Sequence, residues 1–152
     1  MKKKELTVQE MEVVYMPNQS LVSTPKICSS EDAYNLLFKS YNPKTIACQE
    51  EFIVLYVNRA NVPLGIYRAA KGGMCSTTAD VRLVMSVALK ALASGIIISH
   101  NHPSGALKPS LSDDALTHKM RDAGKLLEIP VLDHIIVTPN SGYFSYADEG
   151  MM

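Results

Sequence analysis

Apolar residues along the chain occur in short strand-like runs and in stretches with helical spacing. Runs rich in Ile, Val and aromatic residues, bounded by Gly, Pro or Asn, predict strands because they are short and β-branched. The predicted strands are residues 52–57, 64–69, 96–98, 131–138 and 143–146. Turn-forming residues at 58–61 and 139–142 predict that the first two and the last two strands form hairpins. The wholly apolar run at 96–98 is typical of a strand buried on both faces.

Helical spacing of apolar residues fills the segments between these strands. The start of a helix is indicated by acidic residues after a serine, or by a capping residue before the apolar repeat. The end of a helix is indicated by glycine or proline. Three helices are predicted. The first begins at Ser29 or Ser30, the second covers residues 81–92, and the third covers about residues 112–127. Asn42 and Pro43 are predicted to end the first helix. Asp80 or Thr78 is predicted to cap the start of the second, and Gly95 to end it. One face of the third helix is predicted to be apolar, with Leu116, Met120, Ala123 and Leu127.

Strands and helices mixed along a chain of this length predict a single α/β domain built as a sandwich around one central sheet. The polar segment at 100–109 is interpreted as a loop that ends the buried strand, and residues 71–73 as a second loop. Residues 1–26 are expected to form an N-terminal arm with a short strand at 11–16, and residues 27–152 the folded domain.

Composition narrows the class of protein. Hydrophobic residues make up 47% and charged residues 20% of the 152 residues, as in a globular domain able to bury a core without disulfides. The 15 basic and 15 acidic side chains give a formal net charge of zero. This balance argues against a dedicated nucleic-acid binder, which must neutralise phosphates, but leaves a local basic patch open. No apolar stretch is long enough to span a membrane, so no membrane association is expected.

The cysteines and the start of the chain indicate a compartment. Cys28, Cys48 and Cys75 are odd in number and far apart, and no C-x-x-C pair is present. This usage predicts neither a disulfide framework nor a thiol metal site and is typical of a reducing compartment. Three lysines at residues 2–4 precede acidic and polar residues instead of the apolar core of a secretory signal. A cytoplasmic location is therefore expected.

Two histidines and an aspartate follow the buried strand. His100 and His102 project to the same side if the backbone stays extended, at the carboxyl end of a strand, where α/β sheets commonly bind ligands. Prolines and a glycine in the next segment allow the chain to turn, so that Asp113 in the following helix faces the imidazoles. Two neutral imidazoles and one carboxylate suit zinc and leave a fourth tetrahedral position for water, whose pKa zinc can lower to about 7. The sequence therefore predicts a catalytic zinc site.

Each of these features also has a purely structural explanation. A single histidine is usually structural, an H-x-H pair alone is weak evidence, and Ser110 with Asp113 matches the outline of a capping box. The conjunction of all of them at fixed spacing beside a buried strand favours the metal site. The two roles are compatible, because a serine that caps a helix is fixed in direction.

The run HNHPSG at residues 100–105, followed by Ser110 and Asp113, matches the JAMM signature: H-x-H, seven residues, then S-x-x-D. Together with the run VLDH at residues 131–134, it resembles the RadC-like branch of the JAB/MPN metallopeptidases over about residues 27–151. The resemblance implies a cytidine-deaminase-like α/β/α sandwich with a mixed central sheet, a zinc ion, and hydrolysis of a peptide or isopeptide amide bond. It implies a protein or peptide substrate and leaves the identity of that substrate and the oligomeric state open.

The resemblance also implies roles for two further residues. The family uses a glutamate just before a strand that reads E-x-F followed by aliphatic residues, and this register selects Glu50, with Glu51 as the fallback. Strand alternation places the two on opposite faces, so only one can point at the metal. In this family the glutamate takes a proton from the attacking water and delivers it to the leaving amine. Ser110 resembles the family residue that stabilises the oxyanion.

Some features separate this chain from related classes. A zinc nucleobase deaminase needs H-x-E and P-C-x-x-C, and neither is present. Many RadC-like chains carry His-Pro-Arg where residues 80–82 read Asp-Val-Arg, so contacts at this edge are expected to differ. We expect the chain to act without the N-terminal helical domain of longer members, which removes one candidate nucleic-acid-binding region. The alternative function is a DNA-repair or DNA-associated accessory protein with a structural metal site.

Three residues near the motif have less certain assignments. Asp133 and His134 lie on a predicted strand and form either a hydrogen-bonded core pair, the commoner case, or support for a metal ligand. His118 follows Asp113 by five residues, off its helix face, and is predicted to lie on the surface.

Overall fold

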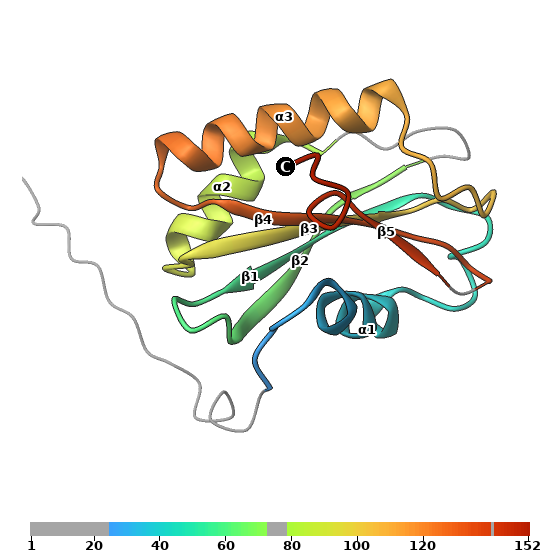
Figure 1. The fold of residues 1–152 in the computed structure, drawn as a ribbon, viewed down its shortest axis with the longest axis horizontal. Helices are drawn as coiled ribbons and strands as arrows, with labels where there is room; N and C mark the ends of the chain where they lie inside the picture. Colours follow the sequence, from blue (N-terminus) through green and yellow to red (C-terminus); the bar gives the residue numbers. More distant parts are fainter. Residues whose placement is uncertain (1–24, 73–78, 141) are drawn as a thin grey trace, which may run out of the picture.

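The computed structural model describes residues 25–72, 79–140 and 142–152, which form one mixed sheet flanked by helices (Figure 1). The five strands lie in the order β2-β1-β3-β4-β5. Their bounds are Glu51–Val57 for β1, Pro63–Lys71 for β2, Gly95–Asn101 for β3, Val131–Val137 for β4 and Tyr143–Ser145 for β5. Strand β1 pairs antiparallel with β2 and β3, and β4 pairs antiparallel with β5. The central pair β3 and β4 is parallel, so the helix between them crosses over the sheet.

Helices cover both faces of the sheet. Helix α1 (Ser30–Ser40) lies on one side, and α2 (Val81–Lys90) and α3 (Leu111–Leu126) lie on the other (Figure 1). Every residue of β1 and β3 is buried, because side chains of both strands alternate between the two layers. In β1, for example, Val54 packs in the core with α2 and α3, whereas Leu55 packs in the core with α1. The predicted single-domain α/β/α sandwich with a mixed central sheet is confirmed.

Two helices begin with the capping residues that the sequence predicts. Ser29 accepts a hydrogen bond from the backbone of Asp32 at the start of α1, and Asp80 accepts one from Arg82 at the start of α2. The prediction that Gly95 ends the second helix is wrong. That helix ends at Lys90, and Leu92 turns the chain with a φ of 50°. An exposed leucine in the left-handed region reverses the chain before Gly95, which instead begins β3.

Two predicted loops are shorter than expected. Strand β3 continues through His100 and Asn101, because both residues still pair with a neighbouring strand and are buried there. The loop predicted from residue 100 therefore begins at residue 102. Lys71 likewise belongs to β2, where it pairs with Glu51.

Three of the four residues predicted for the apolar face of α3 pack against the core: Met120 is fully buried, and Leu116 and Ala123 are partly buried. The most buried residues of this helix are Thr117, Met120 and Gly124, whereas the predicted member Leu127 is 38% exposed. Gly124 sits so close to the chain after α3 that a Cβ there would lie 2.4 Å from the carbonyl oxygen of Ile129. Any residue larger than glycine at position 124 would therefore force the chain after α3 to shift.

Several predictions fall on residues that the structure does not describe. They are the strand at 11–16 and most of the arm at 1–26, the alternative cap Thr78, Gly73 and Cys75. In the part of the chain that is described, none of the helices has the length and apolar character that crossing a bilayer requires.

Candidate metal centre

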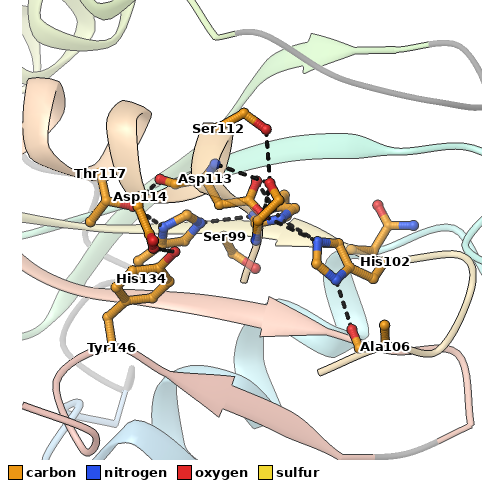
Figure 2. Close-up of polar contacts among 12 residues, drawn as sticks. Ser99, His102, Ala106, Ser112, Asp113, Asp114, Thr117, His134 and Tyr146 are labelled. Atoms are coloured by element: carbon orange, nitrogen blue, oxygen red, sulfur yellow. Dashed lines mark hydrogen bonds and ion pairs between the residues drawn. The ribbon is translucent and has the colours of Figure 1, made fainter. Parts of the chain in front are cut away.

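The three predicted metal ligands meet at the carboxyl end of β3. His100 is the last but one residue of that strand, His102 follows it, and Asp113 lies in the first turn of α3. The Nε2 atoms of the two imidazoles lie 2.9 Å apart. Asp113 Oδ1 is 3.2 Å from His100 Nε2, and Asp113 Oδ2 is 3.5 Å from His102 Nε2 (Figure 2). One ligand atom from each residue lies within 4.8 Å of the others.

Local structure brings Asp113 back to the histidines. The backbone N–H of His102 donates to Val137 O, which keeps the chain extended past the end of β3. The chain then turns at Gly105, whose φ of 82° is accessible to glycine at little cost. Ser110 caps α3 in a capping box: its side chain accepts from Asp113 N at 3.2 Å, and Asp113 Oδ2 accepts from Ser110 N at 2.7 Å. The cap therefore fixes the carboxylate that faces the imidazoles.

The protonation of His102 follows from its backbone partner. His102 Nδ1 lies 2.7 Å from the carbonyl oxygen of Ala106, which can only accept (Figure 2). Nδ1 therefore carries the hydrogen, and in the neutral ring the lone pair on Nε2 points at His100 and Asp113. The hydrogen bond to Asp113 raises the pKa of His102. Burial alone would raise the pKa of Asp113, but the contacts of its carboxylate with His100, His102 and Ser110 outweigh burial and hold that pKa well below its usual range.

The donor set fits a tetrahedral zinc ion. Ligand atoms at 2.0–2.1 Å from a tetrahedral zinc lie roughly 3.3 Å from one another. The three separations between the donor atoms, 2.9, 3.2 and 3.5 Å, bracket that length. Two lone pairs and an ionised carboxylate facing one point repel each other unless a cation lies between them. The residues could therefore hold zinc with adjustments of a few tenths of an ångström.

Zinc affinity is expected to fall as the pH is lowered from about 8 to about 5, because a proton on His102 occupies the lone pair that the metal needs. Asp113 raises the pKa of His102, so this competition begins at a higher pH than for an isolated histidine. Asp113 itself stays ionised over this range and adds no pH dependence. Chelator competition at a series of pH values measures the effect. An affinity independent of pH over this interval would contradict the assignment of His102.

The two glutamates at the start of β1 lie in different surroundings. Glu51 is buried, and its carboxylate forms an ion pair with Arg68 at 2.9 Å. Arg68 also donates to Ser40 O at the end of α1, so this pair lies on the α1 side of the sheet. Glu50 is half-buried, and its charge contributes to raising the pKa of His102, after the stronger effect of Asp113. Of the two carboxylates, that of Glu50 is the one whose charge acts on His102.

Asn101, between the two histidines, holds the segment that carries Glu50. Its amide NH2 donates to Ile46 O at 2.7 Å and to Gln49 O at 2.9 Å, and its Oδ1 accepts from Glu51 N at 2.8 Å. These contacts bracket Glu50 along the backbone, and Asn101 is fully buried. Asn101 could not be predicted from the sequence, because an asparagine between two histidines carries no signal for a partner 50 residues away.

Replacing Asn101 with alanine is expected to destabilise the metal-free protein by about 2–4 kcal/mol, because buried backbone groups lose their partners. Urea unfolding measures the change. Asn58→Ala is the matched control: Asn58 Oδ1 accepts from two backbone N–H groups in a more exposed turn, so its loss is expected to cost about 1 kcal/mol. Equal losses of unfolding free energy in the two variants would show that the buried hydrogen bonds of Asn101 contribute no more to stability than those of an exposed turn.

His134 reaches the cluster and Asp133 does not. His134 Nε2 lies 2.8 Å from His100 Nδ1, and His134 Nδ1 lies 2.6 Å from Thr117 Oγ1 (Figure 2). Burial lowers the pKa of His134 well below its usual value. Asp133 instead accepts from Ser145 Oγ and Ala147 N, and burial raises its pKa. Asp133 and His134 are both buried and are joined by a hydrogen bond from His134 N to Asp133 Oδ1 at 2.7 Å, as in the core pair considered from the sequence. The ring of His134 in addition contacts a predicted metal ligand.

The hydroxyl of Ser110 lies beside the carboxylate, 2.7 Å from Asp113 Oδ2 and 2.8 Å from Ser112 Oγ. Ser110 is exposed, so its side chain can be reached from outside the domain. His118 is exposed on α3, as predicted for a surface residue.

Comparisons with known proteins agree with the motif. The profile of the RadC-like JAB domain matches residues 27–151. A UPF0758 protein of Flavobacterium johnsoniae is 38% identical over 133 residues, which cover 88% of this chain and 56% of the relative. A UPF0758 protein of Porphyromonas gingivalis is 38% identical over 137 residues, or 90% of this chain and 59% of the relative. The chain thus spans little more than half the length of these relatives, and their names state no activity. The chain belongs to the RadC-like JAB domain family.

Proposed function

We propose that the protein is a zinc-dependent hydrolase that cleaves a peptide or isopeptide amide bond with an activated water molecule. The observation that carries the proposal is the convergence of His100, His102 and Asp113 at separations suited to tetrahedral zinc. Three protein ligands with an open fourth position are typical of catalytic zinc sites, whereas structural sites are closed by four. When bound, zinc supplies Lewis acidity that acidifies water and polarises a carbonyl.

Glu50 is the proposed general acid and base. It takes a proton from the attacking water and returns it to the nitrogen of the leaving amine, which would otherwise depart as an unstable anion. Two facts support Glu50 over Glu51: the charge of Glu50 acts on His102, and the carboxylate of Glu51 is engaged by Arg68. The backbone of Glu50 is also anchored, because its carbonyl accepts from Gly72 N at 2.9 Å beside the Asn101 clamp.

Ser110 is the proposed donor to the oxyanion. Its oxygen is fixed by the capping box and is exposed, and its hydrogen, which points at Asp113 Oδ2, can turn towards a substrate while the oxygen stays in place. A donor aimed at the developing negative charge contributes to rate and leaves ground-state binding almost unchanged.

The test combines metal content with cleavage. Purified protein is expected to contain about one zinc per chain. The zinc-loaded form is then screened against a library of peptides and isopeptide-linked peptides, with the chelated protein as the control. Cleavage that disappears on chelation and returns with zinc supports the hydrolase. A zinc-containing protein that cleaves nothing and retains DNA in a salt-sensitive way overturns it in favour of the DNA-associated alternative.

A further inference from the structure

We propose that Thr117 and His134 are positioning residues that fix the tautomer of His100, so that its Nε2 atom is always the one offered to the metal. The proposal rests on the metal site proposed above. It concerns three side chains on three different elements: His100 on β3, Thr117 on α3 and His134 on β4. Their hydrogen bonds form one continuous chain that ends on the backbone of Asp113.

The chain of hydrogen bonds has a defined direction because it ends on a carbonyl. Thr117 Oγ1 lies 2.6 Å from Asp113 O, which has no hydrogen and can only accept. The single hydroxyl hydrogen of Thr117 is therefore used on that contact. Towards His134 Nδ1, also 2.6 Å away, Thr117 can only accept, so Nδ1 of His134 carries a hydrogen.

The tautomer of His134 in turn determines the tautomer of His100. The ring of His134 is fully buried, and its two nitrogens face a hydroxyl and an imidazole, so the neutral form avoids an uncompensated buried charge. With its hydrogen on Nδ1, neutral His134 presents a lone pair at Nε2. His100 Nδ1, at 2.8 Å, must donate to that lone pair. The lone pair of His100 is then left on Nε2, 3.2 Å from Asp113 Oδ1.

Asp113 consequently acts on the cluster in two ways. Its carboxylate faces the histidines directly, and its carbonyl orients them through Thr117 and His134. The same tautomer is imposed on His102 by a backbone carbonyl, that of Ala106. Both imidazoles therefore present Nε2 to one point, one through a loop carbonyl and the other through a buried relay.

Packing holds the relay rings in place. Tyr146 stacks on His134 with ring centres 4.8 Å apart and planes 11° apart, and its hydroxyl donates to Asp114 at 2.8 Å (Figure 2). Phe52 lies parallel to His100, with ring centres 6.2 Å apart. The rings thus have little freedom to flip, so the direction set by the hydrogen bonds is retained. Residues that orient a histidine ligand typically account for 10–100-fold in metal affinity.

The first experiment reads the tautomers directly, by long-range ¹H–¹⁵N NMR of the imidazoles in the zinc-loaded wild-type protein. The expected result is a hydrogen on Nδ1 of both His134 and His100. A hydrogen on Nε2 of His134 overturns the proposal without the need for any variant. If zinc binds while His134 has that other tautomer, the relay is wrong and the metal centre stands. If the wild type takes up no zinc, the proposed metal centre itself is wrong.

The second experiment measures zinc affinity by chelator competition in two variants of one position. Thr117→Val removes the hydroxyl and is expected to weaken zinc binding by about 10–100-fold. Thr117→Ser keeps the hydroxyl, loses only a methyl group, and is expected to bind within a few-fold of the wild type. Because both variants alter the packing of α3, a purely structural role for Thr117 predicts similar affinities for the two. Similar affinities would overturn the relay.

Discussion

Replacing His100 with alanine is expected to abolish stoichiometric zinc uptake. The variant removes one of three convergent donors and leaves His102 and Asp113, a set too small for a stable tetrahedral site. It also removes the partner of the buried His134 Nε2 atom, so the remaining pocket is less ordered. Elemental analysis of the purified protein after dialysis measures the zinc content, which is expected to fall from about one per chain to a trace.

His118→Ala is the matched control for this loss. His118 lies on the same helix as Asp113 but is exposed, so its removal tests whether any histidine contributes to zinc content. The control is expected to keep the full zinc content. Circular dichroism of both variants separates a lost ligand from a lost fold. A folded His100→Ala protein that still carries one zinc per chain would sink the assignment of the centre.

Glu50→Gln is expected to retain zinc and lose turnover by about 10²–10⁴-fold, the usual contribution of a general acid–base residue. Glutamine keeps the shape of the side chain but cannot accept or return a proton. The measurement is the single-turnover rate on a peptide that the wild type cleaves, together with the zinc content of the variant. Loss of zinc would assign Glu50 to metal binding, and unchanged turnover would remove it from the reaction.

Glu51→Gln provides the comparison for that variant. It makes the same chemical change at the next residue, where the carboxylate pairs with Arg68 on the α1 side of the sheet. Turnover is expected to stay within a few-fold of the wild type. If Glu51→Gln instead loses turnover and Glu50→Gln does not, the register of the glutamate before β1 is the opposite of the one proposed.

Much of the fold could be predicted because strand and helix signals are local. Runs such as residues 52–57 and 96–98 are short, apolar and β-branched, and the structure shows both as strands buried on two faces. The errors lie at ends of elements, where tertiary contacts decide. Polar His100 and Asn101 continue β3 because His100 pairs with both β1 and β4, and Asn101 pairs with β4. Leu92, and not Gly95, turns the chain after α2.

The sequence by itself determined which side chains could form the centre. The spacing of two histidines and an aspartate around a turn and a helix cap is a local property, and these residues lie together in the structure. The tertiary structure decided which residues orient them. Thr117, His134 and Asn101 act through partners on other elements, and these contacts depend on strand register, as in the pairing of His134 with Ile98. Periodicity reports only which face of an element is buried, so it cannot specify which buried polar atoms meet across two elements.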